Sequence, residues 1–435
     1  MTEAGDAEPQ DRAEPYLIRI ESREDLAFVL SEASTLEHMI MCEYLFAAFS
    51  LKRNESENIS SGELEMVRRW EGVIDTVAVQ EMTHLALVNN MLVAIGASPY
   101  FQHPNFPQPS RYFSPNIRLA LVPFGEQALR HFLYLERPEG MSIEGVPGFE
   151  VLGDLNPPEL KGGIVPEQQY FTTVGNLYRG IEKGFGDLVS KYGEDGVFIG
   201  KNHTQATEEL FGLASLFEVK DLESARRAVE GIVEMGEGAR GDWTNAHFGM
   251  FLRIFNEFMQ VKAQNPGFRP TKPVVAAYSR PPIGVENATL IADTFTSKVA
   301  DLFNGSYALA VQVLGRFYIH EYDRREELRS LADAAVCIMS RVIEPLGVAL
   351  TTLPIGSQLP GLTAGASFEL PRKGYLLPHR EQAFMVLQER AAELAAHAAG
   401  LQKHSPSVQV ATRLNEVTDA FRDVAGMLRP DSLDI

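Results

Sequence analysis

Two ionisable residues three positions apart, Glu81 and His84, are the strongest chemical signal in this sequence. They lie in a long stretch of helical periodicity, where residues three apart share a face. Their neighbours on that face, Val77, Ala78 and Val88, are apolar, so both side chains are expected in the core, where an unpaired charge is costly. A bound cation would offset this cost. A salt bridge or a hydrogen-bond network would offset it too, and the pair alone does not distinguish a metal site from these two alternatives.

A further carboxylate, Glu37, lies in an earlier helical stretch and shares its face with the apolar Ile40 and Tyr44. It is therefore predicted to be buried and to be a ligand. Glu43 is rotated from Glu37 by about 120° and is predicted to be exposed or to support the ligands from behind. His38 faces about 100° away from Glu37, so packing or hydrogen bonding is the favoured role for it.

Glu182 is a third acid in an apolar stripe, because Tyr178 and Phe185 lie on its face. The neighbouring Lys183 and the flanking glycines 180 and 184 would equally suit a partly exposed face. Glu182 is thus a candidate ligand with a surface alternative.

The last candidate ligands are Glu237 and His247, which are ten residues apart. On a continuous helix they would be rotated by about 80° and would not easily share a site. Glycines 236, 238 and 241 together with Trp243 predict a break between them, which would bring His247 back to the site.

These residues make a set of four carboxylates and two imidazoles: Glu37, Glu81, His84, Glu182, Glu237 and His247. Four-helix bundles that hold two iron or manganese ions use Glu, E-x-x-H, Glu and E-x-x-H. The ten-residue interval departs from the last E-x-x-H, which leaves open whether one ion or two bind. Hard oxygen ligands with imidazole favour iron, with manganese as the alternative, and the absence of a nearby thiolate argues against structural zinc. Beside such a centre, Tyr44 and Tyr178 are candidate catalytic residues with a redox role, although aromatic residues at helical spacing are commonly core.

The elements that must position these residues are predicted to be helices throughout, that is, an all-α fold. The expected helices are 26–51, 63–95, 123–136, 172–192, 222 to beyond 254, 287–320, 323–350, 380–400 and 405–428. Two long ordered loops, 97–118 and 139–169, are rich in proline, and loops of this length are commonly functional. The predicted organisation is a disordered acidic tail at 1–20, a metal-binding bundle at 21–264, a linker at 265–285 and a C-terminal helical domain at 286–435.

The composition and net charge of the chain disfavour some classes of binding partner. The 435 residues carry a net charge of −19, which disfavours nucleic acid and anionic membranes. The acidic N-terminus lacks the features of a signal peptide, and no stretch approaches the roughly 20 apolar residues of a membrane span. The two cysteines, Cys42 and Cys337, do not form a disulfide framework. A cytoplasmic protein is predicted, with the choice between monomer and homodimer left open.

Several sequence segments resemble the ferritin-like domain of the iminophenyl-pyruvate dimer synthase family. They are LEHMIMCEYLFAAFSLK, QEMTHLALVNNMLVAIGASP, FLYLERPE, TVGNLYRGIEKGF and GEG…AHFGMFLRI, spanning about 26–254. The second half, with LFNGSYALAVQVLGRFY and GLTAGASFEL, resembles the helical region that follows in standalone members. The resemblance implies a ferritin-like four-helix bundle and supports Glu37, Glu81, His84, Glu237 and His247 as ligands, and Glu182 less.

The resemblance also implies non-haem, di-iron chemistry of the kind that couples amino-acid-derived imines in bisindole biosynthesis. The leading hypothesis is therefore an oxidase or oxygenase that uses O₂ on a small imine or amine substrate. A ferritin-like storage protein without an organic substrate, a metal-free structural protein and haem ligation by a histidine are the alternatives.

Overall fold

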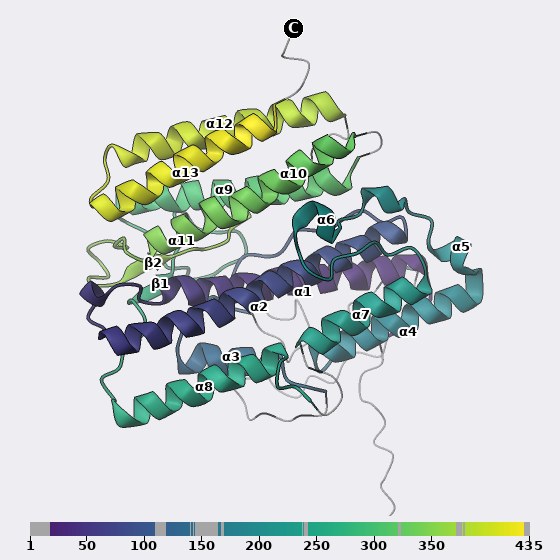
Figure 1. Cartoon of the computed structure of the whole chain (residues 1–435), viewed down its shortest axis with the longest axis horizontal. Helices are drawn as coiled ribbons and strands as arrows, with labels where there is room; N and C mark the ends of the chain where they lie inside the picture. The colour runs from purple at the N-terminus through teal and green to yellow at the C-terminus, as the bar shows by residue number, and fades with distance from the viewer. Residues whose placement is uncertain are drawn as a thin grey trace, which may run out of the picture.

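The chain is all-α in the computed structural model, as predicted (Figure 1). The structure describes residues 18–108, 119–139, 141, 143, 164–166, 169–236, 238, 242–320, 323–370, 376 and 379–429. Most of the predicted acidic tail lies outside these residues. Within the same tail range, however, Ile18 and Ile20 are buried, so the ordered chain begins before residue 21.

Two long antiparallel helices, α1 (Arg23–Ser50) and α2 (Ser61–Ala94), form the centre of the molecule. Each begins at a serine whose side chain accepts a hydrogen bond from the third helical residue, while an acid at that position bonds back. This capping box satisfies amide groups that a helix start leaves free. α1 is buried on nearly all sides from residue 33 to residue 50, as expected for a helix with packed elements around it.

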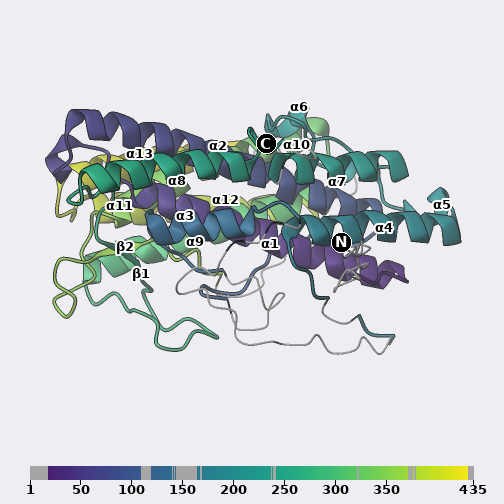
Figure 2. The same ribbon diagram turned by 90° about the horizontal axis from the view of Figure 1, so that it is seen from below.

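The other two members of the four-helix bundle are each interrupted. One consists of α3 (Glu126–Leu135) followed by α4 (Val174–Tyr192), and the other of α7 (Leu222–Gly236) followed by α8 (His247–Gln264). Figure 2 shows α3 and α4 along one line and α8 and α7 along a second. α3 packs on α8 and α4 packs on α7, so both interruptions fall midway along the bundle. The predicted break before His247 is confirmed, because α8 begins at that residue.

The second half of the chain forms a further helical region on the other side of α1 and α2 (Figure 1). It contains α9 (Thr294–Tyr318), α10 (Arg325–Ile338), α11 (Glu344–Leu350), α12 (Arg380–Gln402) and α13 (Val408–Met427). A π-helical turn, Met339–Ile343, joins α10 to α11. Two short strands, β1 (Val274–Ala276) and β2 (Thr363–Gly365), pair in parallel.

Short helical segments complete the described chain: α5 (Glu194–Val197), α6 (Glu208–Phe211) and single 3₁₀ turns at Glu55–Glu57 and Asn202–Thr204. The two halves share a continuous hydrophobic core. The C-terminal region approaches α1 so closely that a Cβ on Gly347 would lie 2.4 Å from the Phe49 ring. The division at 265–285 into two domains stays a prediction. Among the described residues, no helix is long and apolar enough to cross a membrane.

Candidate metal centre

Residues from α1 and α2 form the first part of a buried cluster at the middle of the bundle. Nδ1 of His84 lies 2.9 Å from Oε2 of Glu81 and 3.6 Å from Oε2 of Glu37. Each of the three side chains is at most 3% exposed. The structure thus brings Glu37 together with the E-x-x-H pair, and all three side chains are buried.

Glu81 also belongs to a second group, which comes from the two interrupted helices. Its Oε1 lies 2.9 Å from Nδ1 of His247, the first residue of α8, and the same nitrogen lies 3.6 Å from Oε2 of Glu136. Glu136 follows the last residue of α3. In each group the possible ligand atoms lie within 4.8 Å of one another, and Glu81 offers one oxygen to each. A carboxylate with this arrangement can bridge two ions.

The donor set fits a metal. Nε2 of His247 lies 3.1 Å from Oε1 of Gln80, an acceptor, which places the ring proton on Nε2 and a lone pair on Nδ1. That lone pair faces the oxygens of Glu81 and Glu136, and Nδ1 makes no well-directed hydrogen bond among the described residues. Lone pairs of a buried imidazole and two carboxylates can face one another only with a proton or a cation between them.

Burial and the neighbouring charges shift the pKa values of the acids and histidines in the cluster. Burial and the neighbouring Glu81 raise the pKa of Glu37 to about 8. Burial alone would lower the pKa of both histidines, but the facing carboxylates raise it to about 9 for His84 and about 10 for His247. Burial would raise the pKa of Glu81, yet the two imidazoles hold it well below its usual range. Without a cation, protons on Glu37 and on the two histidines would therefore balance the charge of the cluster, while Glu81 stays ionised.

Two tyrosines hold the outer carboxylates. The Tyr178 hydroxyl donates a hydrogen bond to Oε1 of Glu37, and the Tyr44 hydroxyl donates one to Oε1 of Glu136. Both phenols are fully buried, and burial raises the pKa of each well above its usual range, so both remain protonated donors. Each tyrosine thus fixes the orientation of one carboxylate from behind.

Four of the six predicted ligands meet here: Glu37, Glu81, His84 and His247. Glu182 does not join them, because it lies on a partly exposed face of α4, 3.8 Å from Arg226. The structure therefore agrees with the alternative prediction, in which Glu182 lies on a partly exposed face. Glu237 lies outside the described residues. Glu136, which was not among the predicted ligands, supplies the further carboxylate of the described cluster. Glu136 is the last residue of the segment FLYLE. Apolar periodicity did not identify it as buried, because its helix ends there.

Three further polar residues of this part of the chain are buried. His103 and His131 are 8% and 1% exposed. Glu43 is buried as well: it accepts hydrogen bonds from the backbone amide of Ala120 and from Nε2 of His131. Glu43 therefore ties the segment around residue 120 and α3 to α1.

An open cavity of about 640 Å³ leads from the surface to Gln80, the hydrogen-bond partner of His247. Its lining includes Ala246, the residue before α8, and the polar side chains Arg227, Glu234 and Asn245. This cavity gives small molecules a route to the vicinity of the cluster.

Comparisons with known proteins agree with this architecture. Residues 30–256 match the family model described as Ferritin-like. The chain is 26% identical over 409 residues to dichlorochromopyrrolate synthase of Lentzea aerocolonigenes, covering 87% of this chain and 39% of that protein. It is 27% identical over 369 residues to 2-imino-3-(indol-3-yl)propanoate dimerase of Chromobacterium violaceum, covering 80% and 34%. The chain thus spans less than half of the length of these relatives.

A crystal structure of a ferritin like protein from Caulobacter vibrioides aligns with a TM-score of 0.47 and 17% identity, over 80% of this chain and 99% of that one. This likeness is too distant to add to the argument. The family model, in contrast, covers more than half of the 435 residues and includes the predicted ligands from Glu37 to His247. The chain therefore belongs to the ferritin-like family.

Proposed function

We propose that this protein is a non-haem, metal-dependent oxidase whose centre holds two ions, iron in the first place and manganese as the alternative. The observation that carries the proposal is the position of Glu81, whose two oxygens lie 2.9 Å from imidazoles of two different groups. Glu37 and His84 would complete one ligand set, and Glu136 and His247 the other.

When bound, iron at this centre supplies the electron transfer to O₂ that amino-acid side chains do not provide. The protein supplies the rest. Tyr44 and Tyr178 hold the outer carboxylates, and Gln80 fixes the His247 ring. Such partners of the ligands set ligand orientation and basicity. The burial of the cluster would limit the access of water and competing reductants to the ions.

The substrate class in this proposal is a small, amino-acid-derived imine or amine, with O₂ as electron acceptor. Two relatives have names that refer to chromopyrrolate and to an indolyl iminopropanoate. The cavity beside Gln80 contains Arg227, whose guanidinium suits a carboxylate. The proposal covers oxidation of one such molecule at this centre. The relatives are much longer chains, so the proposal does not extend to their complete reactions.

Oxygen consumption tests the proposal. Protein reconstituted anaerobically with Fe²⁺ is exposed to O₂ with and without 2-imino-3-(indol-3-yl)propanoate as the probe. We expect catalytic O₂ uptake only with the probe, lost in Glu81→Gln and retained in Glu182→Gln, which removes a carboxylate outside the cluster. Uptake that is equal in the Glu81→Gln variant would contradict the proposal.

The same experiment distinguishes the storage alternative. A storage protein would consume O₂ in proportion to added Fe²⁺, retain many iron atoms per chain and leave the imine unchanged. That result would replace the oxidase proposal while keeping the metal centre.

A further inference from the structure

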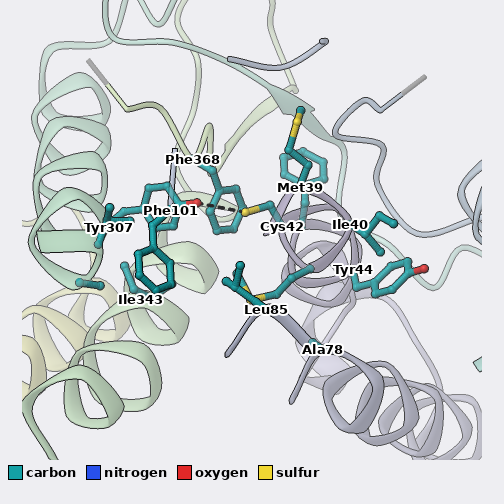
Figure 3. Packing of buried hydrophobic residues seen from close by; sticks show 14 of the residues in the cluster. Met39, Ile40, Cys42, Tyr44, Ala78, Leu85, Phe101, Tyr307, Ile343 and Phe368 are labelled. Carbon is teal, nitrogen blue, oxygen red and sulfur yellow. Dashed lines mark hydrogen bonds between the residues drawn. The ribbon is translucent and has the colours of Figure 1, made fainter. Parts of the chain in front are cut away.

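A second buried cluster lies on another side of α1, between the bundle and the C-terminal helices. It consists of His38 and Cys42 from α1, His103 from the segment after α2, and Tyr307 from α9. All four side chains are buried. His38 and Cys42 are four residues apart and therefore share one face of the helix. In Figure 3, Cys42 points toward Tyr307, whereas Tyr44 leaves α1 in a different direction.

The polar atoms of this cluster converge on one point. The Tyr307 hydroxyl lies 2.7 Å from Nε2 of His38, 2.8 Å from Nε2 of His103 and 3.3 Å from Sγ of Cys42. On its other side, Nδ1 of His103 lies 2.8 Å from the carbonyl oxygen of Pro104. A carbonyl only accepts, so Nδ1 of His103 carries the ring proton and Nε2 directs a lone pair at the centre.

The electrostatics of this cluster differ from those of the carboxylate centre. Its four side chains are two imidazoles, a thiol and a phenol, with no carboxylate among them. Neutral imidazoles are the form that binds metal ions. Burial raises the pKa of the Cys42 thiol, so without a cation the sulfur keeps its proton.

We propose that His38, His103 and Cys42 form a second, mononuclear metal site for a borderline or soft divalent cation of the zinc class, with the Tyr307 oxygen as fourth donor. Two imidazoles and a thiolate are ligands that Zn²⁺ prefers, and iron in the carboxylate centre requires neither the sulfur nor these rings. Binding releases the Cys42 thiol proton to solvent and leaves a sulfur–metal bond, with no change in oxidation state. The site is independent of the proposed oxidase function.

The geometry is close to what such an ion needs. The nitrogen and sulfur donors lie within 4.8 Å of one another. Metal–ligand distances of roughly 2.0–2.3 Å in a tetrahedron place donor atoms somewhat over 3 Å apart. The Tyr307 oxygen is closer than this to the two nitrogens, at 2.7 and 2.8 Å, so it must withdraw by a fraction of an ångström. A mainly apolar cavity of about 90 Å³, lined in part by His38 and Tyr307, provides the space.

The location indicates a structural role. The four donors come from three segments: the central helix α1, the segment after α2 and the first long helix of the C-terminal region. An ion held by all of them would fasten α9 to the bundle. Removing the ion is then expected to weaken the contact between the two halves of the chain.

Cobalt titration tests this site, because Co²⁺ bound by a thiolate shows a charge-transfer absorption that carboxylate ligands do not produce. Full-length protein is titrated with Co²⁺ alone, and the number of bound ions is measured alongside the spectrum. We expect one thiolate-bound Co²⁺ per chain in the wild type. Cys42→Ser should abolish this band, and His103→Gln should weaken its affinity by at least about 10-fold.

The matched controls separate this site from its surroundings. Cys337→Ser removes the other cysteine, which lies in α10 outside the cluster, and should leave the band intact. Glu81→Ala should remove cobalt from the carboxylate centre and leave the thiolate band. A wild-type protein that binds cobalt without any thiolate band would overturn the proposal, whatever the stability of the variants. A band that survives Cys42→Ser would overturn it as well.

Discussion

At the scale of single residues, the central question is what neutralises the buried acids. Glu37, Glu81 and Glu136 are all at most 5% exposed, and two imidazoles face them. Protons can balance the charges, as the raised pKa values of Glu37 and both histidines show. A salt-bridge network would place a protonated histidine at each oxygen of Glu81, and two bound cations would take the place of those protons. Metal content therefore decides between the two.

Tyr178→Phe tests the role of the phenols. Loss of its hydrogen bond to Glu37 should weaken Fe²⁺ binding by roughly 10–100-fold, with unchanged stoichiometry at saturation. Tyr44→Phe should behave alike through Glu136. Tyr318→Phe, which removes a buried hydroxyl bonded to the Ala86 carbonyl, is the control for stability. If affinity is unchanged while turnover of fully loaded enzyme collapses, the tyrosines have a redox role instead of a positioning one.

At the scale of elements, the two interrupted helices determine the site. Both interruptions occur midway along the bundle, so a helix end delivers Glu136 and a helix start delivers His247. The start of α8 depends on a close backbone approach: a Cβ on Gly249 would lie 2.1 Å from the Trp243 carbonyl oxygen. Gly238, at φ +92°, lets the chain turn just after α7.

Gly249→Ala should therefore destabilise the protein by about 1–3 kcal/mol and lower its iron content, because the segment carrying His247 must move. Gly72→Ala is a matched control inside α2, where a new Cβ has no neighbour within 4 Å. That change should stabilise by about 0.5–1 kcal/mol and leave iron binding unchanged. Denaturant unfolding and metal analysis measure both effects. Equal stability of the two variants would contradict the described start of α8.

These elements also show how far the sequence could predict the structure. Apolar periodicity and breakers located α1, α2, α4, α12 and α13 to within three residues of their observed ends, whereas the predicted start of α9 at residue 287 lies seven residues before the observed one. They also identified the acids of the buried cluster that lie inside helices, such as Glu37 and Glu81. Glu136 was missed because it stands at a helix end, where no periodic neighbours define its face. Glu182 looked equivalent to Glu37 locally, and only the packing of α4 on α7 shows that it faces Arg226.

At the scale of the whole molecule, the two halves meet around the C-terminal end of α1. Lys272, just before β1, places its Nζ against the carbonyl oxygens of Phe49 and Leu51, and 3.8 Å from Oε1 of Glu57. A cation at a helix C-terminus suits the helix dipole. Its burial nevertheless lowers the pKa of Lys272 from 10.5 to about 8.

This buried lysine predicts a pH dependence of stability. Between about pH 8 and 10.5 the unfolded state binds more protons at Lys272 than the folded state, so this residue makes stability rise with pH. Relative to Lys272→Met, the wild type should gain up to about 3 kcal/mol across this window. Urea unfolding at pH 7.5 and pH 10 measures the difference, and the exposed Lys403→Met controls for the loss of a lysine. Parallel behaviour of wild type and Lys272→Met would contradict the prediction.

The most direct test of the metal centre is the number of Fe²⁺ ions bound per chain after anaerobic reconstitution. If Glu81 serves both groups, two ions are expected in the wild type and in Glu182→Ala. Fewer than one is expected in Glu81→Ala, because that change removes a ligand from both groups at once. His84→Ala, which belongs to one group only, should retain more iron than Glu81→Ala. Equal iron content in wild type and Glu81→Ala would contradict the account.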